Sequence, residues 1–499
     1  MKGYEWMSRI KNEVDILIIG AGISGIGAAY HVQKHCPNKS YAIIEARNEI
    51  GGTWDLFRYP GVRSDSDMFT FGFNFKPWRS PKAISPGEDI KAYICEAAAE
   101  NSIDKHILFE HKVISSNWDS SSAKWHTEVQ NIQTGEYCQY VSQFFFSGAG
   151  YYNYDEGYTP NFKGVDSFVG EIVHPQFWPQ DLDYAGKNVI VIGSGATAVT
   201  LVPAMAMTAG HVTMLQRSPT YIGSIPEQDK FANVIRRYLP AKLAYSLSRW
   251  RKILLGMFMY SMSRRRPEFV KNIIREGIIN VLGKDYPVDK HFKPNYQPWD
   301  QRACLVPDGD LFNAIKNGSA SVVTDQIDTF TPTGVKLQSG KELSSDIIIT
   351  ATGLNLDILG SYRLSVDDKP FNPADSYCYK GMMLSGLPNF AFSMGYTNAS
   401  WTLKSDLVGQ YVCRLINHMD KHQYHYCQPV LPSGGIEAEP FINFTSSYIT
   451  RALHKMPKQG RDKPWKLNQN YILDRMSLNH RSLEDESIVF ASITANNHN

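Results

Sequence analysis

The sequence predicts an α/β protein with two nucleotide-binding βαβ units and an inserted helical segment. Three observations carry this prediction. The first two are an apolar strand that runs into a glycine-rich turn near residue 20 and the return of the same pattern near residue 193. The third observation is a basic stretch with helical spacing between residues 226 and 300. The chain has 499 residues, which suffices for about three domains.

The first unit lies near the N-terminus. We expect a strand over residues 14–19, a helix to about residue 34 and a second strand over residues 41–45. Gly20, Gly22 and Gly25 permit a tight turn and bring the backbone, with Ser24, close to a pyrophosphate at the helix N-terminus. Glu45 stands where a carboxylate accepts the ribose hydroxyls of an adenosine without a 2′-phosphate. A glycine turn without a ligand is the alternative interpretation.

The second unit differs from the first at the end of its second strand. We expect strands over residues 187–192 and 211–216, and a helix between them that runs to about Thr208. Arg217 then follows, and a guanidinium at this point binds a 2′-phosphate that a carboxylate would repel. The two Rossmann-like units therefore predict an FAD site and an NADPH site. A solvated surface arginine is the alternative for Arg217. The expected NADPH contacts are Gly193, Ser194, Gly195, Ala196, Thr197, Ala198, Arg217 and Ser218.

Two longer motifs identify a family. Residues 51–65 contain Gly-x-Trp-x4-Tyr-Pro-Gly-x3-Asp, and residues 168–179 contain Phe-x-Gly-x3-His-x3-Trp-Pro. Both motifs resemble the fingerprints of class B flavoprotein monooxygenases of the Baeyer–Villiger type. The segments 153–158, 298–301 and 380–386 look like the ethionamide-activating mycobacterial branch of that family.

The resemblance implies roles for individual residues. Asp65 would lie near the reacting edge of the flavin, and Arg302 would reach the flavin and stabilise the peroxide, so these two are the expected catalytic residues. Gln301 departs from the Lys-Arg pair of the family, which leaves a second ligand for the 2′-phosphate open. His174 is interpreted as a hinge residue rather than a general base. The expected FAD contacts are Gly20, Gly22, Ser24, Gly25, Glu45, Thr53, Trp54, Asp55, Asp65 and Val113.

The resemblance also implies a reaction. A C4a-peroxyflavin would attack a ketone and insert one oxygen atom of O2 beside the carbonyl, giving an ester or lactone, and the enzyme would also oxygenate the sulfur of thioamides or sulfides. A flavin-containing monooxygenase that acts mainly on sulfur or nitrogen is the nearest alternative. A pyridine-nucleotide disulfide reductase is more distant, since the seven cysteines form no Cys-x-x-Cys pair. An NADPH-dependent flavin reductase is another distant alternative. A non-catalytic flavin-binding module is a further alternative. No metal site is expected.

A domain division follows from the order of the motifs. Residues 1–150 and 358–499 are expected to form the FAD-binding domain, and residues 151–225 and 301–357 the NADP-binding domain. Residues 226–300 are expected to form the helical insert.

The helical insert carries unbalanced charge. Residues 230–275 contain twelve Lys or Arg residues and one acidic residue, Glu268. Basic amphipathic helices bind membrane surfaces, whereas a solvated face on a packed insert is the other interpretation. Net charge is only +2, which argues against nucleic acid as a partner. We find no secretory pattern and expect a cytoplasmic protein. Whether the protein also contacts a membrane peripherally stays open. The oligomeric state stays open.

Overall fold

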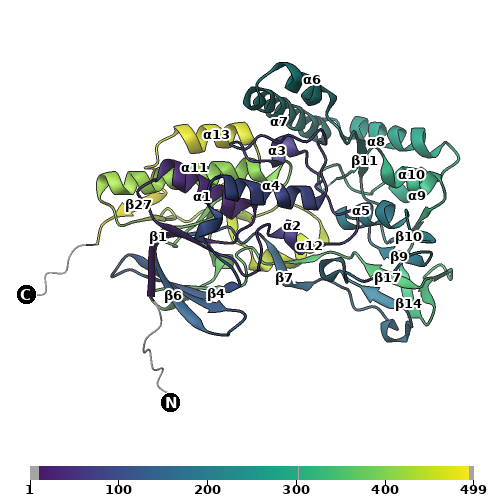
Figure 1. The fold of residues 1–499 in the computed structure, drawn as a ribbon, viewed down its shortest axis with the longest axis horizontal. Coiled ribbons are helices and arrows are strands. Elements are labelled where there is room, and N and C mark those ends of the chain that lie inside the picture. Colours follow the sequence, from purple (N-terminus) through teal and green to yellow (C-terminus); the bar gives the residue numbers. More distant parts are fainter. Residues whose placement is uncertain (1–10, 302, 494–499) are drawn as a thin grey trace, which may run out of the picture.

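The chain folds around two sheets, each of which carries one of the predicted glycine-rich turns. The computed structural model describes residues 11–301 and 303–493. Figure 1 shows the larger sheet on the left, the smaller sheet on the right, and helices α6 and α7 above them.

The larger sheet contains the first glycine-rich turn. Its strand order is β20-β19-β4-β5-β6-β1-β2-β3, and β23 pairs with β6. Strand β1 pairs in parallel with both β2 and β6, so the chain must cross over the sheet between β1 and β2, which it does through α1 (Ile23–His35). The strands are β1 (Lys11–Ile19), β2 (Tyr41–Ile44), β3 (Ile107–Leu108), β4 (His111–Asp119), β5 (Lys124–Asn131), β6 (Tyr137–Ser147), β19 (Arg363–Val366), β20 (Lys369–Phe371) and β23 (Phe390–Phe392).

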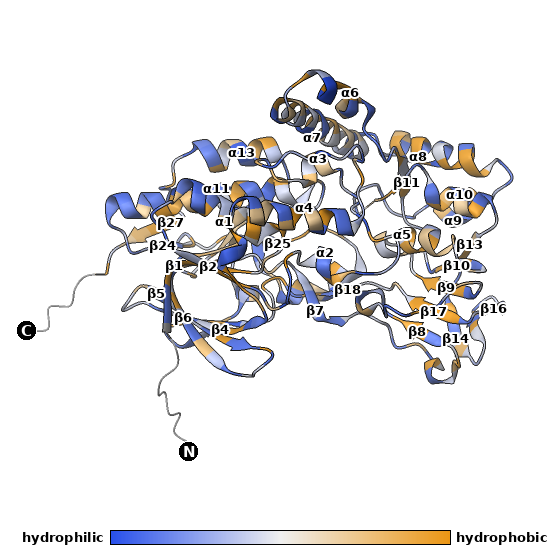
Figure 2. Ribbon diagram, viewed as in Figure 1, coloured by the Kyte–Doolittle hydropathy of each residue, from blue (hydrophilic) through white to orange (hydrophobic). Residues whose placement is uncertain are grey.

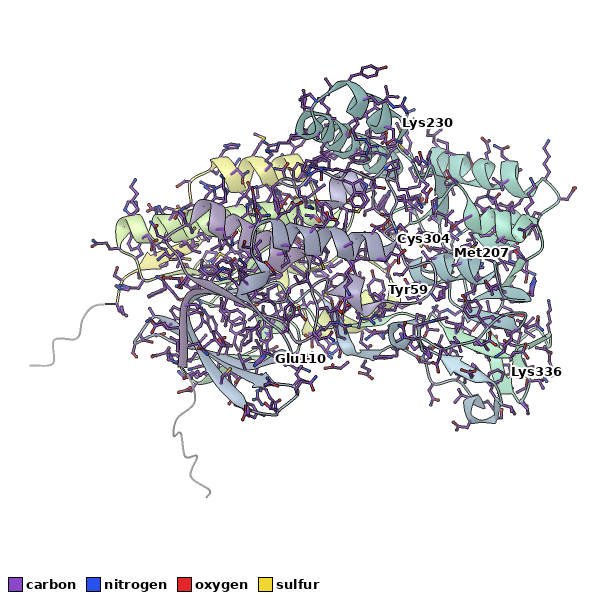
Figure 3. The ribbon with its side chains drawn as sticks, in the orientation of Figure 1. Tyr59, Glu110, Met207, Lys230, Cys304 and Lys336 are labelled. Atoms are coloured by element: carbon purple, nitrogen blue, oxygen red, sulfur yellow. The ribbon has the colours of Figure 1, made fainter. Side chains whose placement is uncertain are left out.

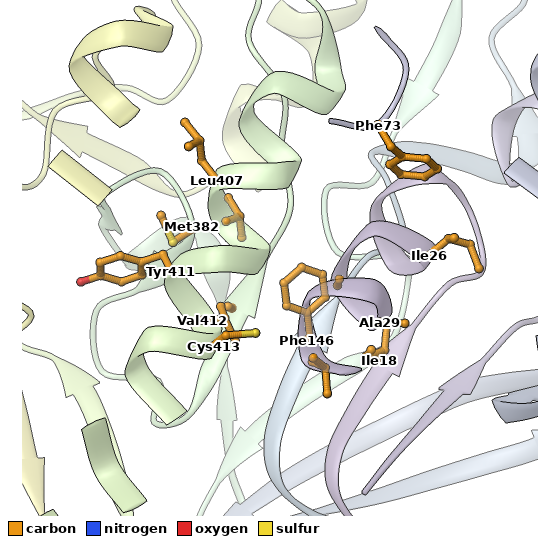
Figure 4. Packing of buried hydrophobic residues seen from close by; sticks show 14 of the residues in the cluster. Ile18, Ile26, Ala29, Phe73, Phe146, Met382, Leu407, Tyr411, Val412 and Cys413 are labelled. Atoms are coloured by element: carbon orange, nitrogen blue, oxygen red, sulfur yellow. The ribbon is translucent and has the colours of Figure 1, made fainter. Parts of the chain in front are cut away.

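The two ends of the chain share one core. Helix α11 (Trp401–His422) packs on α1, and α4 (Gly87–Glu100) and α13 (Tyr471–His480) lie beside them. Ile26 of α1 and Val412 of α11 are both buried in this core (Figure 4). Apolar side chains from the first and last parts of the sequence therefore close over the first βαβ unit.

The smaller sheet is entirely parallel. Its order is β13-β10-β9-β17-β8, and its central strands carry the hydrophobic colour in Figure 2. Such continuous apolar strands are typical of parallel sheets. The strands are β8 (Glu171–Val173), β9 (Asn188–Ile192), β10 (His211–Gln216), β13 (Ala320–Thr324) and β17 (Ile347–Thr350). Helix α10 (Asp310–Lys316) packs against α5 (Ala196–Met205).

One helix ends earlier than the sequence suggested. We expected α5 to reach about Thr208, but it ends at Met205. The carbonyl oxygen of Met205 accepts hydrogen bonds from both Thr208 and Ala209, which turns the chain toward β10.

Shorter elements connect the two halves. Strand β7 (Tyr152–Gly157) pairs antiparallel with β18 (Leu354–Leu356) where the chain passes between the sheets. A three-stranded antiparallel sheet lies between β13 and β17 in the sequence, and it is formed by β14 (Ile327–Thr331), β15 (Gly334–Leu337) and β16 (Glu342–Ser344). The C-terminal part adds β21 (Cys378–Tyr379), β22 (Met383–Leu384), β24 (Tyr426–Pro429), β25 (Ala438–Pro440), β26 (Lys458–Gly460), β27 (Ile488–Ala491) and α12 (Ser447–Ala452).

The helical insert leaves and rejoins the second unit at one place. Strands β11 (Ile222–Ile225) and β12 (Cys304–Pro307) pair in parallel at its two ends. Between them lie α6 (Lys230–Tyr238), α7 (Ala241–Arg265), α8 (Pro267–Leu282) and α9 (Val288–Phe292). Within the described ranges, no helix is both long enough and apolar enough to cross a bilayer.

Candidate functional site

A large cavity lies between the two halves of the molecule. Its volume is about 1530 Å³, whereas a pocket for one drug-sized ligand occupies about 300–1,000 Å³. The lining combines the first glycine-rich turn, the second glycine-rich turn, the loop 51–65, the end of β17 and α12. The cavity is therefore large enough to receive two extended ligands together.

Most of the predicted site residues meet in this cavity. Three predicted cofactor contacts, Gly25, Asp55 and Ala198, do not line it, and Arg302 lies outside the described residues. Its neighbours in the sequence, Gln301 and Cys304, are on the lining. The predicted residues that do line the cavity are Gly20, Gly22, Ser24, Glu45, Thr53, Trp54, Asp65, Val113, Gly193, Ser194, Gly195, Ala196, Thr197, Arg217 and Ser218.

Close backbone packing explains the first glycine-rich turn. Gly20 has a φ of +93°, and a Cβ atom there would lie 2.8 Å from the carbonyl oxygen of Gly148. A Cβ atom at Gly25 would lie 1.8 Å from the oxygen of Gly20, so this glycine serves helix–strand packing rather than the cavity. Helix α1 begins after Gly22 without a side-chain cap. Its first amides therefore suit an anionic ligand.

Glu45 is held against the same turn. One carboxylate oxygen accepts a hydrogen bond from the amide of Ala21 at 2.6 Å, and the other accepts one from the amide of Arg47 at 2.8 Å. Burial raises the pKa of Glu45, and these two hydrogen bonds oppose that rise. The carboxylate thus has a defined position beside the turn, where it can accept ribose hydroxyls.

Asp55 does not line the cavity but holds in place the residues that do. It lies in α2 (Thr53–Leu56), and its side chain is fully buried. Its carboxylate accepts hydrogen bonds from Arg47 at 2.6 Å, Lys91 at 2.7 Å and Arg58 at 3.1 Å. Burial by itself would raise the pKa of Asp55, but the hydrogen bonds from Lys91 and Arg47 outweigh it and lower the pKa. This network holds α2, whose Thr53 and Trp54 face the cavity.

The Tyr-Pro-Gly part of the loop 51–65 joins the two halves. Tyr59 is buried in the core of the smaller sheet. Gly61 has a φ of +78°, and a Cβ atom there would lie 2.6 Å from the carbonyl oxygen of Thr200 in α5. Arg63 donates to the Asp310 carboxylate of α10 at 2.6 Å. The loop therefore packs on the second unit before it returns to the cavity at Asp65.

The second glycine-rich turn repeats the first one's geometry. Gly193 has a φ of +143°, and a Cβ atom there would lie 2.3 Å from the oxygen of Ala351. Helix α5 begins after Gly195 without a side-chain cap. Arg217 is exposed at the end of β10, and it makes no ion pair with any residue in 11–301 or 303–493. A free cation beside uncapped helix amides suits a phosphorylated ligand.

Arg451 is a site residue that the sequence analysis missed. Its guanidinium carbon lies 3.3 Å from the ring centroid of Tyr158, and it lines the cavity. Its Nε and Nη2 atoms are buried without a hydrogen-bond partner among the described residues. Burial lowers the pKa of Arg451. A Cβ atom added at Gly353, just beyond β17, would lie 3.7 Å from Nη2. No motif surrounds Arg451 in the sequence, so only the fold brings it to the site.

His174 is held between the two halves. Its Nδ1 accepts a hydrogen bond from the amide of Gln176 at 3.2 Å, so its Nε2 is the nitrogen that can donate to the oxygen of Gly353 at 3.2 Å. Burial lowers the pKa of His174, which favours the neutral ring. Both ring nitrogens of His174 are engaged in hydrogen bonds, and the residue is not on the cavity lining.

Comparison with known proteins gives relatives over almost the whole chain. The family of NAD(P)-binding Rossmann-like domains matches residues 18–80. The chain is 51% identical over 479 residues to the FAD-containing monooxygenase EthA of Mycobacterium tuberculosis, covering 96% of this chain and 98% of the relative. It is 49% identical over 488 residues to the probable FAD-binding monooxygenase AlmA of Acinetobacter baylyi, covering 96% of this chain and 97% of the relative.

Solved structures share the fold. An oxidised steroid monooxygenase bound to NADP superposes with a TM-score of 0.75 at 20% identity, covering 96% of this chain and all of the other. An open form of cyclohexanone monooxygenase superposes with a TM-score of 0.74 at 18% identity, with the same coverage. The predicted arrangement of two Rossmann-like units with a helical insert is confirmed.

Proposed function

Since this chain belongs to the family of FAD-containing monooxygenases, we propose that it oxidises NADPH and inserts one oxygen atom of O2 beside a ketone carbonyl. The product is an ester or lactone, and the second oxygen atom leaves as water. Thioamides or sulfides are further substrates, oxygenated at sulfur. The observation that carries the proposal is the cavity, because both glycine-rich turns line it and two cofactors can meet there.

FAD would occupy the half of the cavity formed by the larger sheet. The amides at the start of α1 suit its diphosphate, and Glu45 suits its ribose. Thr53, Trp54 and Val113 line the same region. When bound, FAD supplies hydride acceptance and O2 activation. Under the proposed domain division, residues 1–150 and 358–499 provide this half.

NADPH would occupy the half formed by the smaller sheet. Arg217 is available for the 2′-phosphate, and the start of α5 suits the diphosphate. We assign Arg451 to the phosphate groups as well, because a guanidinium whose Nε and Nη2 have no hydrogen-bond partner among the described residues is stabilised by an anionic acceptor. This cation stands in a part of the sequence remote from Gln301, which replaces the family lysine.

Asp65 and Arg302 are the proposed catalytic pair. Asp65 lies on the cavity lining and would orient Arg302. The guanidinium of Arg302 would place positive charge beside the reacting oxygen. In a poorly hydrated site such a charge is worth about 2–4 kcal/mol to the transition state.

Product analysis under ¹⁸O2 tests the reaction. Purified holoenzyme with NADPH and a ketone should yield ester that contains one ¹⁸O atom, with one NADPH consumed per ester. Arg302→Ala should abolish ester formation, while Met207→Ala, an exposed side chain away from the cavity, should not. NADPH oxidation that yields only hydrogen peroxide would refute the proposal and favour a flavin reductase.

The preference for ketone over sulfur substrates can be measured as the ratio of ester to sulfoxide. Ester formation requires the anionic form of the oxygen-donating group, whereas oxygenation of sulfur requires its protonated form. The ratio of ester to sulfoxide should therefore increase with pH. A ratio that does not depend on pH would favour the alternative, an enzyme that acts mainly on sulfur or nitrogen.

We propose further that the protein is cytoplasmic and contacts a membrane through its helical insert. All seven cysteines are free thiols, as a reducing compartment would keep them. The excess of Lys and Arg in residues 230–275 favours an anionic surface as the partner of the helical insert.

A further inference from the structure

The helical insert exposes an unusual amount of apolar surface. Of the 21 large apolar side chains that are exposed among the described residues, 11 stand on α6, α7 and α8. These three helices form only about a tenth of the chain. Scattered exposed apolar residues need no explanation, but a concentration of this kind marks an interaction surface.

On α7 four of the six exposed large apolar residues form one stripe. Leu243, Leu247, Leu254 and Phe258 follow at intervals of four, seven and four residues, which places them on one face of the helix. Each has between 45% and 57% of its surface exposed. The opposite face is used by the protein itself: Arg249 is buried and donates to the carbonyl oxygens of residues 69 and 72.

The short helix α6 extends this stripe. Phe231, Val234 and Tyr238 are exposed at intervals of three and four residues, again on one face. The guanidinium of Arg251 lies 4.5 Å from the ring centroid of Phe231. Arg251 lies on α7 between Leu247 and Leu254, so the exposed faces of the two helices are adjacent. We call these seven apolar residues the insert surface.

The insert surface stands away from the body of the molecule. Figure 1 shows α6 and α7 projecting above both sheets, and Figure 3 shows Lys230 near this end. Such a position allows a large flat partner to approach without meeting the sheets.

Unpaired positive charge surrounds the insert surface. Five exposed cations make no ion pair with any described residue. Glu268, the single acid within residues 230–275, is already bound to Lys271 at 2.7 Å. A second copy of this surface would bring like charges together, whereas anionic lipid would neutralise them. The five cations are Lys230, Arg237, Lys242, Arg265 and Arg266.

We propose that the insert surface docks on an anionic lipid bilayer. The apolar stripe enters the boundary between headgroups and acyl chains, and the five cations face the lipid phosphates. This inference specifies which face of the helical insert makes the membrane contact proposed above. It does not depend on the oxygenation chemistry, since none of these residues lines the cavity.

Vesicle flotation with the holoenzyme tests the proposal. Wild type should float with vesicles of about 30% phosphatidylglycerol in phosphatidylcholine and should dissociate as salt increases, because exposed charges are screened. Leu254→Ser with Phe258→Ser should weaken binding at least about tenfold, since two apolar anchors are lost. Arg237→Glu with Lys242→Glu should weaken it by at least a similar factor.

Matched variants control for general effects. Met207→Ser with Met476→Ser removes exposed apolar surface elsewhere, and Lys336→Glu with Lys341→Glu makes the same change in net charge on another face. Both control pairs should bind vesicles as wild type does. Oxygenation of a water-soluble sulfide should be unchanged in every variant, which separates this proposal from the proposed function.

Three results would overturn the proposal. The first is wild type that stays at the bottom of the gradient with anionic vesicles. The second is equal binding by the insert-surface variants and the controls. The third is a dimer in sedimentation analysis that the Leu254→Ser and Phe258→Ser pair converts to monomer while wild type binds no vesicles.

Discussion

At the scale of the residue, two arginines in one cavity differ in what surrounds them. Arg217 is exposed at the end of β10 and lines the cavity, where its charge is available to a ligand. Arg451 is stacked on Tyr158, and two of its buried nitrogens have no partner within the described part of the chain. The position of Arg217 suits contact with a phosphate that NADP⁺ has and NAD⁺ lacks. The position of Arg451 suits contact with the diphosphate, which both nucleotides share.

Nucleotide titration separates these two roles. Arg217→Ala should weaken NADP⁺ binding by about 10–100-fold and leave NAD⁺ binding unchanged, because hydrogen bonds to a charged group are worth about 1.5–3 kcal/mol. Arg451→Ala should weaken both nucleotides by a similar factor, because the diphosphate is common to both. Isothermal titration of the holoenzyme measures both affinities.

Conservative variants sharpen this comparison. Arg451→Lys keeps the charge but loses the planar stack on Tyr158, so it should recover only part of the affinity. Arg363→Ala, an exposed arginine of β19, should change neither affinity. A loss restricted to NADP⁺ in Arg451→Ala would contradict its assignment to a shared phosphate group.

At the scale of the element, α2 depends on charge rather than on its own length. Four residues cannot form a stable helix alone. The buried carboxylate of Asp55 binds cations from three segments and so ties this short helix to its surroundings. This dependence makes the stability of the region sensitive to pH.

Asp55→Asn should lower the melting temperature most at neutral pH. The pKa of Asp55 is lower in the folded protein than in the unfolded chain, where it is near 3.9. The ionised carboxylate therefore contributes its full stabilisation above the pKa of the unfolded chain. This stabilisation is lost as pH falls through the lower pKa of the folded protein. Removing one partner of a buried ion pair lowers the free energy of unfolding by at least about 3 kcal/mol. We expect this lower limit for Asp55→Asn, because the cations that pair with Asp55 are partly exposed. Differential scanning calorimetry should give a difference of about 5 °C at pH 7 that narrows below about pH 4.

A solvent-exposed pair provides the control. Glu437 and Arg461 lie 2.7 Å apart with both side chains about 60% exposed. Glu437→Gln should therefore change the melting temperature little at any pH. A difference for Asp55→Asn that stays constant from pH 7 to pH 3 would show that the ion pairs do not stabilise α2.

At the scale of the whole molecule, the loop 51–65 couples the two halves. It begins at the first glycine-rich turn, packs on α5 through Gly61, binds α10 through Arg63 and returns to the cavity at Asp65. One segment thereby positions both nucleotide units around a shared space. Its packing should matter for stability and for electron transfer between the halves.

Gly61→Ala should disturb this junction. The φ of +78° disfavours a side chain by about 1–2 kcal/mol, and the new Cβ atom would also lie 2.6 Å from backbone of α5. We expect a lower melting temperature and slower reduction of the flavin by NADPH. Gly135→Ala has a φ of +75° but no atom within 4 Å, so it isolates the cost of the backbone conformation. Equal effects of the two substitutions would exclude a role for the contact with α5.

Local sequence patterns were sufficient to predict the two βαβ units. The strand over residues 211–216 has the predicted bounds, and the glycine spacings match the turns that the structure forms. Both depend on residues close together in the sequence, where backbone geometry leaves few choices. The family was also identifiable, and the relative from Mycobacterium tuberculosis confirms it.

The sequence by itself determined the two nucleotide units, their order and the family. The tertiary structure decided which side chains reach the cavity. Asp55 belongs to the family motif but points into an ion-pair network, while Arg451 belongs to no motif and lines the site. Spacing along the chain determines local conformation, but a cavity is assembled by packing between distant segments. Residues such as Arg451 can therefore be assigned only once the segments are in contact.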